Sequence, residues 1–98
     1  MALQLTRTVG TAVVFQIKDR TAELRFDRVQ DDEVLFGLII NDRFKRARRS
    51  VDSTLNFQAG GELISVYVQE LRDSRAVLRI TASENVHILR RELAPQTE

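Results

Sequence analysis

Positively charged side chains that could hold an anion are concentrated in two stretches of this 98-residue chain. The segment Arg43–Val51, RFKRARRSV, places five cations in nine residues, and Arg90 and Arg91 form a smaller pair near the C-terminus. Arginine donates parallel hydrogen bonds to phosphates and to guanine edges, so both stretches are candidates for contact with nucleic acid. Taken alone, each is more simply explained as a charged edge strand that faces water and discourages sheet aggregation.

The residue types that carry out catalysis are too few or too isolated for an active site. His87 is the only histidine, and the acidic run Asp31–Glu33 is most simply a turn. The sequence has no cysteine, no glycine-rich phosphate loop, no nucleophile elbow and no arrangement of paired acids. It therefore predicts that the protein is not an enzyme and uses no metal or other cofactor.

The composition predicts a small cytoplasmic domain in which any anion site is a local patch. The formal net charge is only +1, although 30% of the residues are charged. A protein that bound nucleic acid by charge alone would be basic over its whole surface. One tyrosine, five phenylalanines and no tryptophan argue against a platform that stacks bases. No signal peptide is visible, and no apolar run approaches the ~20 residues of a membrane helix, so no membrane partner is expected.

Alternation of apolar and polar residues predicts an all-β fold. It marks strands over residues 22–29, 33–40, 63–71 and 75–80, with polar turns at residues 30–32 and 72–74. Each of these strand pairs is followed by a basic strand candidate, FKRARRSV or NVHILRREL. Helix signals are poor: a capping-like Asp52-Ser53 is cut off by QAGG, and RRELAPQTE has room for one helical turn before Pro95.

The chain matches itself when it is shifted by 42 positions. Arg7 falls on Arg49, Phe15 on Phe57, Asp31 on Asp73, and Arg48 and Arg49 on Arg90 and Arg91, without a gap. The shared order of strand, turn, strand and strand is stronger support than these few identities. The pattern indicates an internal duplication, and the alternative is two ordinary β-meanders in succession.

Both ends of the chain resemble the CsrA/RsmA family of carbon storage regulators. LTRTVGTAVVF, residues 5–15, is similar to the first two strands of that family, with Thr8 in place of its second arginine and Thr11 in place of its glutamate. SENVHILRREL, residues 83–93, looks like its last strand. The family's Gly-x-x-Ala-Pro turn is reduced to Gly37 in the first half and Ala82 in the second.

The resemblance implies an interlocked sheet fold that binds single-stranded RNA. In the family, each site joins the first strand of one protomer to the last strand of the other and takes GGA-containing loops of mRNA or small RNA, which modulates translation. Carried over to this chain, the RNA-binding residues are Leu5, Thr6, Arg7, Thr8, Val86, His87, Ile88, Leu89 and Arg90. Arg7 is expected to contact phosphate and Arg90 a guanine edge or a phosphate. A second, weaker set consists of Lys45, Arg46, Arg48 and Arg49.

Residues 1–98 are expected to form one domain, and two explanations account for a chain longer than that family's usual length. It is either one family unit with an insertion or two fused repeats, about residues 3–51 and 46–93. The 42-residue spacing favours the fused repeats, which would place the basic run on a strand at the seam and make the chain a self-contained pseudo-dimer. A single unit with an insertion would instead be a homodimer. The alternative function is a degenerate module that binds proteins and no longer binds RNA.

Overall fold

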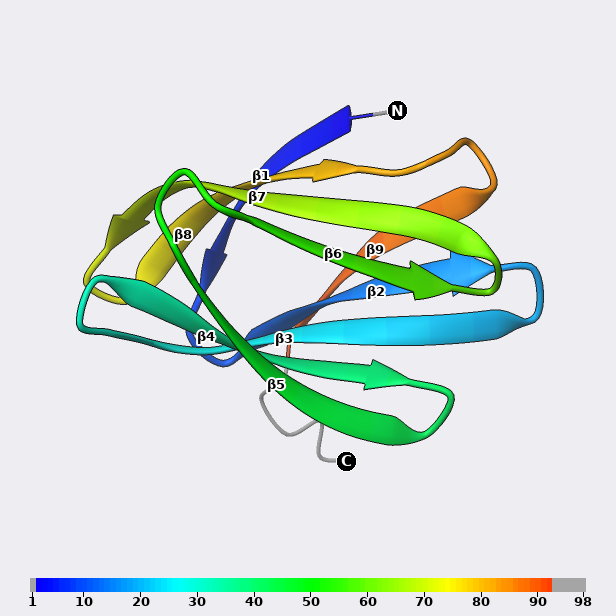
Figure 1. Ribbon diagram of the computed structural model, residues 1–98, viewed down its shortest axis with the longest axis horizontal. Coiled ribbons are helices and arrows are strands. Elements are labelled where there is room, and N and C mark those ends of the chain that lie inside the picture. The colour runs from blue at the N-terminus through cyan, green and yellow to red at the C-terminus, as the bar shows by residue number, and fades with distance from the viewer. Residues whose placement is uncertain (1, 93–98) are drawn as a thin grey trace.

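The structure, a computed structural model, describes the backbone of residues 2–92 and the side chains of residues 3–89, and it confirms an all-β fold (Figure 1). No helix occurs in this part of the chain. Its strands are β1 (Ala2–Thr8), β2 (Thr11–Ile17), β3 (Arg20–Gln30), β4 (Glu33–Ile40), β5 (Arg43–Ser50), β6 (Thr54–Ala59), β7 (Glu62–Arg72), β8 (Arg75–Thr81) and β9 (Val86–Glu92).

The strands form two antiparallel sheets that pack face to face (Figure 1). The five-stranded sheet has the order β5-β4-β3-β2-β9, and the four-stranded sheet has the order β1-β8-β7-β6. Within the described residues, no helix has the length and apolar character needed to cross a membrane.

The first and last strands each join the sheet that the other half of the chain builds. β1 pairs along its whole length with β8, and β9 pairs along its whole length with β2. Neither pairing is a hairpin between neighbours in sequence, because more than sixty residues separate the paired strands in each case. The two halves are therefore interlocked through their terminal strands.

The core lies between the sheets and follows the period-two alternation of the sequence. In β3 the buried residues are Ala22, Leu24 and Phe26. In β7 they are Ile64, Val66 and Val68. Successive strand residues point to opposite faces, so one apolar row from each sheet fills the space between them.

An aromatic pair joins β2 of the five-stranded sheet to β6 at the edge of the four-stranded sheet. Phe15 of β2 is fully buried, and its ring meets that of Phe57 of β6 edge to face, with centroids 5.6 Å apart. Such pairs add about 0.5–1.5 kcal/mol to the burial of their area.

Hairpin turns with left-handed residues connect the paired strands. Asp31 and Asp32 both have positive φ, as do Asn41 and Asp42, which is the pattern of two-residue type I′ turns. The predicted turns are confirmed, although Gln30 and Arg72 at their edges still belong to strands. The acidic run at Asp31 is thus a turn with a backbone conformation that Asp and Asn adopt more readily than most residues.

Strand positions recur at the spacing of 42 residues found in the sequence. β3 covers residues 20–30 and β7 covers residues 62–72, so both bounds differ by 42. The register of β3 against β4 shifts between Phe26 and Arg28, and that of β7 against β8 shifts between Val68 and Glu70, again 42 residues later. The same bulge therefore increases the twist of both long strands at equivalent points.

The weak helix signals do not produce helices in the described residues. The segment Ser53–Phe57 leads into β6, whose Leu55 and Phe57 point to the core. At the C-terminus, residues 90–92 belong to β9, and the rest of the predicted helical turn lies outside the described residues. Burial of an alternating apolar row outweighs a single capping residue at Ser53.

Candidate nucleic-acid interface

The two strands assigned to RNA by the sequence occupy edges of different sheets. β1 is the outer strand of the four-stranded sheet and β9 is the outer strand of the five-stranded sheet. Each has a hydrogen-bonded strand on one side only, among the residues that the structure describes. An edge strand presents a row of free N–H and C=O groups, which can bind another chain or a base edge.

The side chains of β1 are divided between the core and the solvent. Leu5 and Arg7 are buried, whereas Thr6 and Thr8 are exposed. Thr6 also lines a shallow hollow of about 130 Å³ on the outer face of its sheet, together with Arg72 and Arg75. This strand therefore offers a ligand the threonine hydroxyls, the Gln4 amide and the edge backbone.

Arg7 is a structural residue in this geometry. Its side chain is only 9% exposed, and its Nε donates a hydrogen bond of 3.1 Å to Thr11 Oγ1. The Thr11 hydroxyl in turn donates to the carbonyl oxygen of Thr8 at 2.7 Å. The phosphate contact expected of Arg7 does not fit this burial, because a guanidinium enclosed between two sheets cannot reach a solvated backbone. Instead Arg7 fixes the corner between β1 and β2.

This corner brings the ends of β1 and β9 close to each other. Thr11, which accepts the hydrogen bond from Arg7, pairs with Glu92 in the β2–β9 ladder. The C-terminal ends of both edge strands therefore meet at the start of β2. The predicted residues 86–89 pair with residues 14–17 and lie farther along β2 from this corner.

Side chains of β9 alternate in the same way as those of β1. Val86 is buried and Ile88 is half-buried, whereas His87 and Leu89 are exposed. Arg90 pairs with Val13 in the ladder, and its side chain lies outside the described residues. Val86 and Leu5 can take part in binding only through their backbone groups, because their side chains belong to the core.

The basic strand β5 distributes its cations over both faces of the five-stranded sheet. In the ladder with β4, Lys45 pairs with Leu38 and Arg49 with Val34, so these two cations share the face that carries the core. Arg46 and Arg48 pair with Gly37 and Leu35 and lie on the outer face. The prediction that the basic run is a strand is confirmed, and its four cations belong to two separate surfaces.

On the outer face, Arg46 and Arg48 border a hollow of about 470 Å³. Arg46 lies over the ring of Phe44 with its guanidinium carbon 5.6 Å from the centroid, and Arg48 forms a 3.4 Å ion pair with Glu33. Both cations are solvent-exposed and partly engaged by neighbours. Such exposed pairs contribute little energy, so both side chains stay available to an anion.

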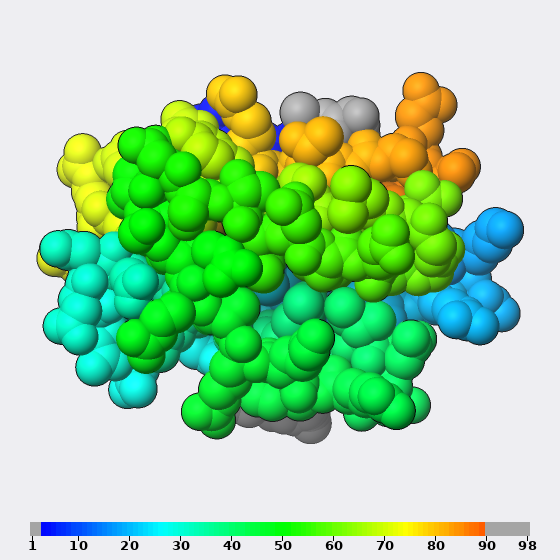
Figure 2. Space-filling view, viewed as in Figure 1, coloured from blue at the N-terminus to red at the C-terminus, as the bar shows by residue number. Residues whose placement is uncertain are grey.

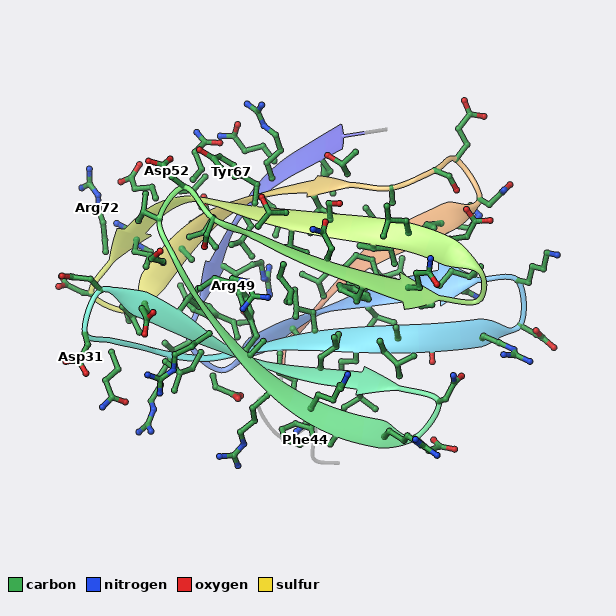
Figure 3. All side chains as sticks on the ribbon, in the orientation of Figure 1. Asp31, Phe44, Arg49, Asp52, Tyr67 and Arg72 are labelled. Atoms are coloured by element: carbon green, nitrogen blue, oxygen red, sulfur yellow. The ribbon has the colours of Figure 1, made fainter. Side chains whose placement is uncertain are left out.

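The sequence pattern does not predict that two further residues, Asp27 and Arg28, both line this hollow. Simple alternation places them on opposite faces of β3, but the register shift after Phe26 leaves both exposed beside the hollow. A β-bulge changes the direction of side chains in this way, and the sequence has no turn residue at this point that would predict the bulge. The sequence pattern also does not reveal the hydrogen bond of 2.5 Å from the Tyr67 hydroxyl to Asp52 Oδ1. Figure 3 labels both residues near the turn that leads into β6.

The chain was compared with protein-family models, with curated proteins and with solved structures. None of the three comparisons finds a match.

Proposed function

We propose that this protein binds single-stranded RNA through the edge strands β1 and β9 and regulates translation in the cytoplasm. The observation that carries the proposal is the exchange of terminal strands. β1 and β9 come from opposite ends of the chain, lie on the edges of different sheets, and converge where Thr11 pairs with Glu92. The approach of these two ends supports the proposal, because each site of the CsrA/RsmA regulators joins a first strand to a last strand.

The chemistry offered at these edges suits unpaired bases. Edge N–H and C=O groups of residues 5–8 and 86–89 can hydrogen-bond the base edges of a splayed-out strand. Thr6, Thr8 and His87 add exposed donors and acceptors, and Leu89, half exposed, offers an apolar surface to a base. With Arg7 buried, Arg90 is the arginine of these strands that we assign to guanine recognition.

The sequence specificity expected of this site is a preference for GGA in a loop. A gel-shift experiment with a hairpin that displays GGA, and with the same hairpin carrying GCA, tests it directly. With only about two to four phosphate contacts, we expect a salt slope of roughly −0.7 per contact on single strands. Equal binding of the two hairpins, combined with a steep salt dependence, would instead indicate nonspecific contact with the basic strand.

Two arginine variants locate the site. Arg90→Ala is expected to lose roughly 1–3 kcal/mol of RNA binding, as a bidentate contact would. Arg48→Ala is the matched control and should lose less than ~1 kcal/mol, because this side chain lies on the exposed outer face of β5 and is paired with Glu33. If Arg48→Ala abolishes binding while Arg90→Ala does not, RNA sits on β5 and the assignment to the β1 and β9 edges is wrong.

A further inference from the structure

One strand position in the four-stranded sheet has no occupant among the described residues. β2 and β6 are equivalent in the 42-residue spacing, and their buried rows, Val13–Ile17 and Leu55–Ala59, coincide. β2 is flanked by β3 and β9, but β6 is flanked by β7 alone. β5, which precedes β6 in the chain, pairs instead with β4 in the other sheet. The outer side of β6 is therefore an open edge, whereas the equivalent side of β2 is paired with β9.

The backbone of β6 presents hydrogen-bonding groups along this edge. Arg49 Nε donates to the carbonyl oxygen of Thr54 at 3.1 Å, which shows that this carbonyl points away from β7. In an antiparallel strand, the N–H and C=O of alternate residues point to the same side. Those of Asn56 and Gln58 consequently point to the edge as well. They offer two donors and two acceptors at the spacing of a polypeptide strand.

Beside this edge lies a groove with a volume of about 580 Å³. Its apolar lining comes from Leu38 and Ile40 of β4 and from Leu55 and Phe57 of β6. Figure 2 shows this region as a crease between the residues of β6 and those of β4 and β5. The five-stranded sheet extends past the edge of the four-stranded sheet here, so the core-side face of β5 is only partly covered.

The groove carries positive charge from the core-side face of β5. Lys45 and Arg49 share the face of Leu38 and Val34, and Figure 3 places Arg49 between the two sheets. None of the described residues that line the groove is acidic. Lys45 is exposed and makes no ion pair or hydrogen bond with the described residues. The Lys45 ammonium is therefore available to pair with a carboxylate of a ligand in the groove.

We propose that the edge of β6 binds an extended acidic segment of a partner protein, which adds a fifth strand to the four-stranded sheet. Its backbone would pair with the edge groups of Asn56 and Gln58, and alternate side chains would enter the groove toward Lys45 and Arg49. Strand addition of this kind draws affinity from main-chain hydrogen bonds and specificity from alternate side chains. β6 has six residues, which sets the length of the bound segment.

Charge and geometry favour this occupant over two others. A second copy of the chain would bring its own Lys45 and Arg49 to the same edge, and like charges would face each other. Single-stranded RNA is negatively charged and would complement the positive groove, but its backbone lacks the alternating N–H donors and C=O acceptors of a β-strand. The aromatic residue of the groove, Phe57, is also only 9% exposed, so it offers no face for base stacking.

The test uses a labelled six-residue peptide of alternating valine and glutamate, with fluorescence anisotropy at low salt as the readout. We expect binding by the full chain and about tenfold weaker binding by Lys45→Glu. Arg75→Glu, the same charge change on an exposed residue remote from the groove, should bind as the unmodified chain does. No binding up to about 1 mM peptide, or binding unchanged by Lys45→Glu, would overturn the proposal.

Hydrogen exchange tests strand addition separately from charge attraction. Saturation with the peptide should slow exchange at the amides of Asn56 and Gln58 and leave those of β1 and β9 unchanged. Asn56→Pro removes one edge donor without removing a ladder donor to β7, and it should abolish binding in a chain that remains folded by circular dichroism. If an oligouridine competes for the groove and is lost in Lys45→Glu, the groove binds RNA and the peptide proposal fails.

Discussion

Arg49 Nε donates a hydrogen bond of 3.1 Å to the carbonyl oxygen of Thr54, across the corner between β5 and β6. Arg7, 42 positions earlier, donates from the same atom and over the same distance to Thr11 Oγ1, across the corner between β1 and β2. The two arginines are equivalent in the chain, but Arg7 is 9% exposed and Arg49 is more accessible. One therefore stabilises a corner from inside the protein, and the other from its surface.

This difference gives unequal costs for removing the two side chains. Arg7→Ala should lower the free energy of unfolding by about 1–3 kcal/mol, because it removes a buried hydrogen-bond donor together with its packing. Arg49→Ala, the matched control, should cost about 1 kcal/mol or less, because water can replace its hydrogen bond to Thr54. Urea unfolding followed by circular dichroism measures both. Equal and small costs would mean that Arg7 is not held in the core.

The aromatic pair between the sheets should dominate the stability of the core. Phe15→Ala removes a fully buried ring and its edge-to-face contact with Phe57, so we expect a loss of about 3–5 kcal/mol. Phe44→Ala deletes the same side chain from a position that is 50% exposed, and should cost less than about 1 kcal/mol. Denaturant midpoints measure both losses, and similar shifts in the two variants would show that the Phe15 ring is not buried between the sheets.

The turn between β4 and β5 can be improved by a single substitution. Asp42 has φ of 63°, in the left-handed region that favours glycine, and it follows Asn41 at 52°. Asp42→Gly creates the Asn-Gly pair preferred in type I′ turns and should raise the stability by about 0.5–1 kcal/mol. Asp19→Gly is the control, because Asp19 is not among the residues with positive φ. Thermal unfolding should show a higher midpoint for Asp42→Gly and a lower one for Asp19→Gly.

The single tyrosine provides a pH readout of the corner that leads into β6. The hydrogen bond from its hydroxyl to Asp52, together with the negative charge of Asp52, raises the pKa of Tyr67 above its ordinary value of 10.0. The folded state thus favours the protonated phenol. Its contribution to stability is complete below pH 10.0 and is lost as the pH rises through the higher pKa of the folded state.

Asp52→Asn tests this assignment by removing the charge while keeping a residue that tolerates the positive φ at this position. The pKa of Tyr67, followed by the absorbance of tyrosinate, should fall toward its ordinary value. Asp31→Asn makes the same change in another turn and should leave the titration where it is. A titration that does not move in Asp52→Asn would show that the two side chains are not joined in solution.

The assembly state follows from how much of the core one chain encloses. Both sheets and the apolar rows between them come from a single chain, and the edge strands exchange within it. We expect a monomer of 11.2 kDa in sedimentation experiments at micromolar concentration. A mass of twice that value would count against a self-contained pseudo-dimer and in favour of an obligate homodimer.

Strand positions and turns could be predicted from the sequence because they depend on local pattern. The alternation of Leu24 and Phe26 with charged residues predicts a half-buried strand whatever its neighbours are. The basic run from Arg43 was also predicted as a strand, and its alternation already placed Lys45 and Arg46 on opposite faces. The register shift after Phe26 could not be predicted, because a bulge depends on how a strand meets its partner.

Only the tertiary structure decided which strands pair and what each face meets. Alternation gives the face of a residue but not the sheet that its strand joins, so the pairing of β1 with β8 and of β9 with β2 was beyond the sequence pattern. The same long-range pairing buries Arg7, which the sequence offered as a phosphate ligand, and it leaves the edge of β6 open beside Lys45. The sequence shows which residues are charged, but which of them are buried or accessible is decided only when distant strands pack together.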